Sequence, residues 1–171
     1  MEKFGLIKNV LTDIDLDNWK KIYQQVTSTK TNEGDLCWGI DINCLAYNWF
    51  LKQVMPVIQT NFDPEVKLIF SSFIKLYSPI KIHNDIKSIP NGDSGRHYKS
   101  ILIPLSVEGD KLDFKNVSTR FYDDNKNLTD TITWEPNSIL WWDSETLHDS
   151  GDFKKNNVEY KEYIITHTYV H

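Results

Sequence analysis

The chain has 171 residues, of which 40% are hydrophobic and 25% charged, a composition that suits one globular domain with a sizeable core. A formal net charge of -5 argues against a phosphate-backbone partner, so nucleic acid is disfavoured. No apolar run approaches the roughly 20 residues of a membrane span, and no secretory signal is recognisable. Two cysteines without a CxxC pair, Cys37 and Cys44, disfavour a thiolate zinc site and favour a reducing compartment, so the expected location is the cytoplasm.

The first third of the chain carries the helical patterns. A helix is predicted over 19–27, and a second one from Asn43 to about Gln59. Pro56 lies inside the second pattern and should kink this helix or end its regular part, because proline removes a backbone donor. We expect residues 1–64 to form a helical support within a single domain.

Short β-rich runs alternate with turn-type stretches in the rest of the chain, over residues 65–171. The runs are 66–70, 73–77, 81–83, 98–107, 118–122, 131–134, 138–142 and 160–170. About eight short strands with regular turns predict a sandwich or barrel, and this number suits a jelly roll. The expected fold is therefore mainly β (α+β), with the N-terminal helices packed on one outer face of the β core.

His83 and Asp85 form a His-x-Asp pattern that ends an extended run. Side chains two residues apart on a strand point the same way, so this imidazole and carboxylate would share a face. His148 follows an apolar run and a short turn, and its neighbours Asp143 and Asp149 are candidate acceptors for an imidazole N–H. Two imidazoles and one carboxylate with the other positions open are the ligands of non-haem Fe(II) oxygenases. The sequence therefore predicts a metal site, provided that the three side chains meet in space.

Three segments of the chain resemble the Fe(II)/2-oxoglutarate-dependent dioxygenases, with the aspartyl/asparaginyl β-hydroxylase and prolyl hydroxylase-like branch as the closest. They are residues 77–85, 95–105, and 134–142 leading to His148. The resemblance covers about residues 66–170 and follows the order of the family's motifs. It implies a double-stranded β-helix, which is a jelly-roll variant, with iron bound at its open end by His83, Asp85 and His148.

The resemblance also implies Fe(II), 2-oxoglutarate as cosubstrate, and ascorbate as an additional candidate cofactor. The family usually places an Arg or Lys on the strand after the distal His, and Lys161 occupies the matching segment, 13 residues past His148. Arg96 is a second candidate anchor, because it lies eight residues before Pro104, as does a cosubstrate-binding arginine in the aspartyl hydroxylase branch. Tyr98 would share a strand face with Arg96 and donate a hydrogen bond to the same carboxylate.

The activity that the resemblance implies is hydroxylation of a C–H bond in an amino-acid side chain, protein-borne or free, or in a small metabolite. Two alternatives stay open: a non-catalytic jelly-roll module that binds sugar or peptide, and a cupin-type metalloenzyme that does not use 2-oxoglutarate. Cupins usually draw on more histidines near the first ligand, and His97 is the only one nearby. Arg120 is a further candidate for the substrate side. The sequence does not indicate the oligomeric state.

Overall fold

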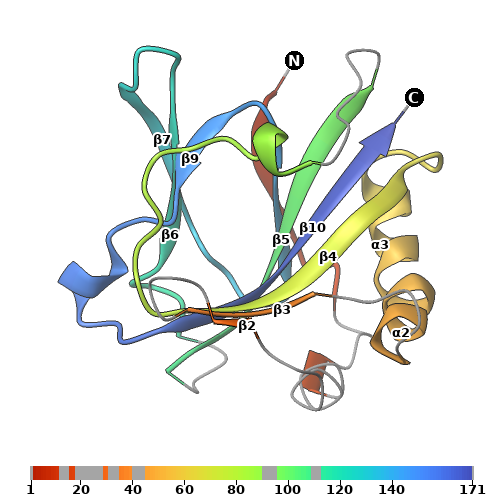
Figure 1. Ribbon diagram of the computed structural model, residues 1–171, viewed down its shortest axis with the longest axis horizontal. Helices are drawn as coiled ribbons and strands as arrows, with labels where there is room; N and C mark the ends of the chain where they lie inside the picture. Colours follow the sequence, from red (N-terminus) through yellow and green to blue (C-terminus); the bar gives the residue numbers. More distant parts are fainter. Residues whose placement is uncertain are drawn as a thin grey trace.

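Two antiparallel sheets face each other in the computed structural model (Figure 1). The structure describes residues 2–11, 16–17, 29–30, 35–39, 45–89, 96–108 and 113–170. The strands are β1 Phe4–Lys8, β2 Thr29–Lys30, β3 Leu36–Gly39, β4 Lys67–Leu76, β5 His97–Val107, β6 Ser118–Tyr122, β7 Leu128–Thr133, β8 Ser138–Asp143, β9 Leu147–Asp149 and β10 Lys161–Val170. The large sheet has the order β1-β8-β5-β10-β4-β3-β2, and the small sheet has the order β7-β6-β9. This architecture confirms the predicted jelly roll.

Two helices, α2 (Leu45–Gln53) and α3 (Met55–Asn61), cover the outer face of the large sheet (Figure 1). The buried side chains of these helices, and of Val54 between them, form one apolar cluster with residues of the sheet: Phe50, Val54, Met55 and Ile58 with Phe73, Ile101, Ile103, Ile139 and Ile164. Pro56 lies in the first turn of α3, so the predicted interruption of the long helix is confirmed. The helix predicted over 19–27 lies outside the described residues. No helix in the described part of the chain has the length and apolar character to cross a bilayer.

The strands differ from the predicted runs at several places: β7 begins three residues before its predicted run 131–134, and β9 was not predicted. The runs 66–70 and 73–77 merge into β4, because the intervening Ser71 is buried and its hydroxyl lies 2.9 Å from that of Thr166 on β10. The predicted strand 81–83 is reduced to a single bridge at its last residue. The N-terminal part of the chain contributes strands as well as helices, since β1 pairs with β8 and β3 with β4.

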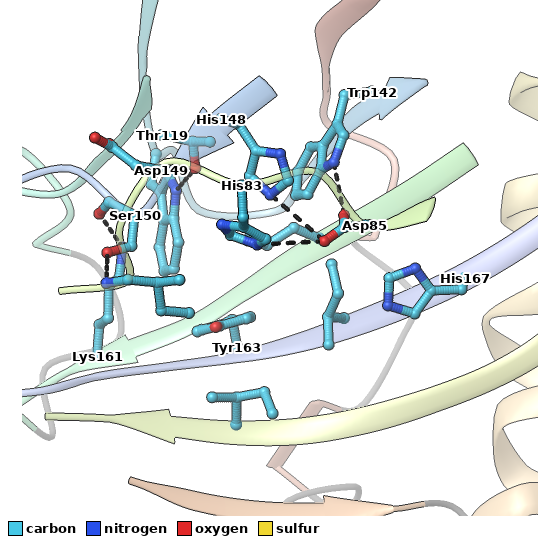
Figure 2. A pocket seen from close by; sticks show the side chains of 15 residues that line it. His83, Asp85, Thr119, Trp142, His148, Asp149, Ser150, Lys161, Tyr163 and His167 are labelled. Atoms are coloured by element: carbon cyan, nitrogen blue, oxygen red, sulfur yellow. Dashed lines mark hydrogen bonds and ion pairs between the residues drawn. The ribbon is translucent and has the colours of Figure 1, made fainter. Parts of the chain in front are cut away.

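The space between the two sheets holds a second apolar cluster, to which β4, β5, β6, β8 and β10 all contribute. Within it lies a pocket of about 190 Å³ (Figure 2). Alternate residues of β10 line this pocket because side chains on one face of a strand recur with period two: Lys161, Tyr163, Ile165 and His167. One face of β10 therefore forms one side of the pocket.

Gly151, just after β9, has a left-handed backbone with φ of 66°. A Cβ at this position would lie 2.8 Å from both the carbonyl and hydroxyl oxygens of Ser118. We therefore expect Gly151→Ala to lower the free energy of unfolding by about 1–3 kcal/mol, as measured by urea denaturation. Asn157→Gly is the matched control at another left-handed position, φ 61°, and should change stability by less than about 0.5 kcal/mol. Equal stability of Gly151→Ala and the parent would contradict this assignment.

Candidate metal centre

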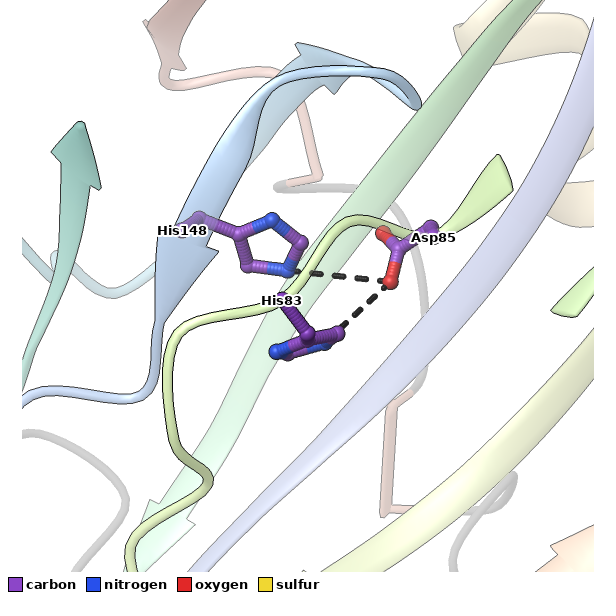
Figure 3. Close-up of side chains that lie close together, drawn as sticks. All are labelled: His83, Asp85 and His148. Atoms are coloured by element: carbon purple, nitrogen blue, oxygen red, sulfur yellow. Dashed lines mark ion pairs between the residues drawn. The ribbon is translucent and has the colours of Figure 1, made fainter. Parts of the chain in front are cut away.

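His83 and His148 lie directly opposite each other on neighbouring antiparallel segments (Figure 3). The His83 N–H donates to the His148 carbonyl at 3.0 Å, and the His148 N–H donates to the His83 carbonyl at 2.9 Å. Opposed residues of an antiparallel pair project to the same side, and the two ring centroids are 4.3 Å apart. One reciprocal pair of backbone hydrogen bonds therefore brings together two histidines that are distant in the sequence.

Backbone carbonyls determine which nitrogen of each imidazole faces the site. Nδ1 of His83 is 2.8 Å from the Lys81 carbonyl, and Nδ1 of His148 is 3.0 Å from the Thr146 carbonyl. A carbonyl oxygen only accepts, so both Nδ1 atoms carry a proton and Nε2 is the atom of each imidazole that is available as a metal ligand.

The expectation that Asp143 or Asp149 would accept an imidazole proton is wrong, because both carboxylates are engaged elsewhere. Asp143 accepts a hydrogen bond from the Lys99 ammonium at 2.7 Å. Asp149 accepts two hydrogen bonds from the Arg120 guanidinium, at 2.8 and 2.6 Å, and one from the Tyr122 hydroxyl at 2.7 Å. Arg120 therefore ties β6 to β9, which carries His148.

Asp85 completes the group, but by a different route from the strand alternation that the sequence pattern predicts. Its backbone is αR, and it precedes a 3₁₀ turn over Ile86–Ser88. The Ser144 carbonyl accepts hydrogen bonds from the N–H groups of Asp85 and Ile86, at 2.9 and 3.1 Å. The turn that follows β8 thus anchors the turn that carries the carboxylate.

The ligand atoms of the three residues lie within 4.8 Å of one another. Oδ1 of Asp85 is 3.4 Å from Nε2 of His83 and 3.7 Å from Nε2 of His148 (Figure 3). Metal–ligand bonds of about 2.0–2.2 Å place neighbouring ligand atoms of an octahedron about 3 Å apart, so small side-chain shifts suffice to bind an ion. The structure brings the three predicted ligands together in a set that fits Fe(II).

Protonation in the metal-free site also suits a divalent cation. Burial opposes ionisation of Asp85, but the hydrogen bond with His83 and the electrostatic influence of the nearby His148 and His167 rings hold its pKa well below the usual value. Burial lowers the pKa of His148, which favours the neutral imidazole that a metal binds. Burial has the same tendency at His83, yet Asp85 raises its pKa overall, so a bound metal would displace a proton there.

Lys161 lines the same pocket as the three candidate ligands (Figure 2). It is 1% exposed, and its ammonium donates to the Ser150 carbonyl at 2.7 Å and lies over the Trp134 ring at 4.2 Å. Within the described part of the chain no carboxylate forms an ion pair with it, and burial lowers its pKa to about 7, opposed only by the charge of Asp149. A buried ammonium without a counter-ion is costly, so this end of the pocket favours an anionic ligand.

Arg96 and Tyr98 do not line the pocket of the triad. They line a separate hollow beside the end of α3, and the Arg96 guanidinium lies 4.7 Å from the centroid of the Tyr169 ring. Leu102 is the residue of β5 that reaches the triad pocket, and Tyr98 lies four residues before it, or about 13 Å along the strand. The structure therefore places Lys161, and not Arg96 or Tyr98, with the candidate metal ligands.

Among the pocket residues that were not identified from the sequence are Trp142 and His167. The Trp142 indole N–H donates to Oδ2 of Asp85 at 2.8 Å. His167, 5% exposed, has Nδ1 3.1 Å from the Ser100 hydroxyl. The period-two alternation that starts at Lys161 would have placed His167 on the pocket face, whereas the contact of Trp142 depends on the tertiary fold.

Neither a protein-family model nor a curated protein sequence matches this chain. Its fold is similar to that of solved non-haem oxygenases. The 2-oxoglutarate-dependent carbocyclase SnoK from nogalamycin biosynthesis superposes with a TM-score of 0.73 at 9% identity, covering 98% of this chain and 79% of that one. A Pseudomonas putida prolyl-4-hydroxylase has a TM-score of 0.63 at 12% identity, covering 99% and 92%.

A third structure, HygX from Streptomyces hygroscopicus with nickel and 2-oxoglutarate bound, has a TM-score of 0.66 at 9% identity and covers 97% of this chain and 82% of its own. Similarity at such low identity establishes the fold alone. The chain has the jelly-roll fold of the 2-oxoglutarate- and Fe(II)-dependent oxygenases, and a His-Asp-His group lies in the pocket between its sheets.

Proposed function

We propose that this protein is an Fe(II)- and 2-oxoglutarate-dependent oxygenase. The observation that carries the proposal is a single pocket with two complementary features, the His83, Asp85 and His148 ligand set and a buried ammonium at Lys161. Two imidazoles and one carboxylate on one face suit Fe(II) and leave positions open. 2-Oxoglutarate has a metal-chelating 2-oxo acid at one end and a second carboxylate at the other, so one molecule satisfies both features.

When bound, Fe(II) and 2-oxoglutarate supply the chemistry: one atom of O₂ enters the succinate that forms from 2-oxoglutarate with loss of carbon dioxide, and the other atom of O₂ enters a C–H bond of the substrate. The protein holds and orients these groups. The triad binds the metal, and Lys161 binds the distal carboxylate as a point charge. Apolar pocket residues, among them Leu102 and Ile165, exclude water.

The finer proposal is hydroxylation of a C–H bond in an amino-acid side chain, protein-borne or free, or in a small metabolite, as in the aspartyl/asparaginyl and prolyl hydroxylase-like branch. The size of the pocket supports a small reacting group. A cavity of about 150 Å³ accepts benzene, so a pocket of about 190 Å³ would have little space left once 2-oxoglutarate is bound. The bulk of the substrate would then stay outside the pocket. The cytoplasmic location remains a prediction.

Ligand binding to metal-loaded protein tests this proposal. Calorimetry with Mn(II)-loaded, anaerobic protein should show binding of 2-oxoglutarate, and much weaker binding of glutarate, which lacks the keto group, and of 2-oxobutyrate, which lacks the distal carboxylate. With Fe(II) and air, the protein should release succinate from 2-oxoglutarate.

The same experiment separates the alternatives. A non-catalytic binding module would take up neither metal nor 2-oxoglutarate. A cupin-type enzyme would bind the metal but would not distinguish 2-oxoglutarate from 2-oxobutyrate, and this result would overturn the cosubstrate assignment.

A further inference from the structure

The two oxygen atoms of Asp85 have different surroundings. Oδ1 faces Nε2 of both candidate histidine ligands, whereas Oδ2 accepts a hydrogen bond from the indole N–H of Trp142 at 2.8 Å (Figure 2). The donor and the acceptor are both buried, at 2% and 7% exposure. A hydrogen bond to an ionised carboxylate is strong in such an environment, and an indole can only donate. The carboxylate therefore cannot rotate without breaking this bond.

Trp142 also contacts a second ligand. Its ring centroid lies 4.6 Å from that of the His148 imidazole and 6.0 Å from that of Phe121, so packing on the inner face of β8 holds the indole in place. One side chain thus restrains the carboxylate through its N–H and one imidazole through its ring.

We propose that Trp142 is a positioning residue of the metal centre, which keeps Asp85 bound to the metal through Oδ1 alone. A carboxylate that binds through one oxygen occupies one coordination position, whereas a bidentate one occupies two. The indole bond therefore keeps a position open beside the metal. Its importance for 2-oxoglutarate chelation rests on the proposed function, but its effect on metal binding does not.

Trp142→Phe tests the proposal, because phenylalanine keeps an aromatic ring on β8 and removes the donor. Co(II) is the probe, and it is titrated into metal-free protein while its visible absorption is recorded. We expect Trp142→Phe to weaken Co(II) binding about 10- to 100-fold and to change the absorption band, since the coordination of Asp85 changes. If Trp142→Phe bound Co(II) with the affinity of the parent and showed the same absorption band, the proposal would be overturned. Failure of the parent protein to bind Co(II) would overturn both this proposal and the proposed function.

Trp134→Phe is the matched control for metal affinity. Trp134 is equally buried, at 2% exposure, and lines the same pocket, but its N–H donates to the Thr119 hydroxyl at 3.0 Å. This variant should bind Co(II) with the parent affinity. An equal loss in both variants would show that ring volume, and not the N–H, determines the affinity, and would overturn the proposal.

A measurement on the unmodified protein covers the case in which Trp142→Phe does not fold. In ¹H–¹⁵N spectra, the indole N–H of Trp142 should exchange slowly with solvent and should shift when Zn(II) is added, because its acceptor then shares charge with the metal. The indole N–H of Trp134 should shift much less. A Trp142 signal that does not move on Zn(II) binding would contradict its role.

Discussion

His83→Ala and Asp85→Ala should each abolish 2-oxoglutarate turnover and lower the affinity for Fe(II) or Co(II) by more than roughly 100-fold, since each removes a direct ligand. His83→Ala is the cleaner variant. Its side chain is 36% exposed, and the backbone bridge to His148 does not depend on the imidazole. Asp85→Ala leaves the Trp142 N–H without its acceptor, at a cost of about 1–3 kcal/mol, which loss of a buried charge partly offsets.

Metal content, succinate release and circular dichroism of the same preparations measure this result. Native dichroism with loss of bound metal is the expected combination for both variants. His97→Ala is the control, because this exposed histidine lies on β5 and does not line the pocket of the triad. Succinate release at the parent rate in both ligand variants would reject the metal centre.

The sequence predicts the jelly roll well where strands are long and buried. β5 and β10 carry continuous apolar and β-branched runs, and β6 is found at its predicted bounds, Ser118–Tyr122. β1 was missed because it is partly buried at nearly every position, so it lacks the period-two pattern of a half-buried strand. The segment is a strand because its backbone pairs with β8, a tertiary contact that its own sequence does not indicate.

The candidate site shows the same division between local pattern and tertiary contact. The candidate ligands could be selected from their chemistry and order, yet the strand alternation predicted for His83 and Asp85 was incorrect. Asp85 meets His83 because the Ser144 carbonyl holds its turn, and not because both lie on one strand. Arg96 matched the family's spacing to Pro104, but this spacing does not determine which pocket its side chain lines, and Arg96 lines the hollow beside α3. Lys161 lies farther from His148 than the family spacing, but it occupies the strand after the distal His and faces the pocket.

Lys161→Met should weaken the binding of 2-oxoglutarate to the metal-loaded protein about 10- to 100-fold while leaving metal affinity unchanged. Methionine retains most of the buried volume, so the loss reports the charge-assisted hydrogen bond to the distal carboxylate, which is worth about 1.5–3 kcal/mol. Arg96→Ala, in the separate hollow, is the discriminating control and should bind 2-oxoglutarate as the parent does. If Arg96→Ala bound 2-oxoglutarate more weakly than the parent and Lys161→Met bound it equally well, Arg96 and not Lys161 would be the anchor of the distal carboxylate.

The pH dependence of 2-oxoglutarate binding provides a second test of Lys161, because burial lowers its pKa to about 7 in the free protein. A bound carboxylate stabilises the ammonium and raises this pKa, so binding above pH 7 must take up a proton. The dissociation constant of Co(II)-loaded protein for 2-oxoglutarate should therefore rise by up to about tenfold per pH unit between pH 7 and 9. Lys161→Met has no group to protonate and should lack this rise. A parent protein whose affinity stays constant over the same range would show that Lys161 is not the residue that receives the distal carboxylate.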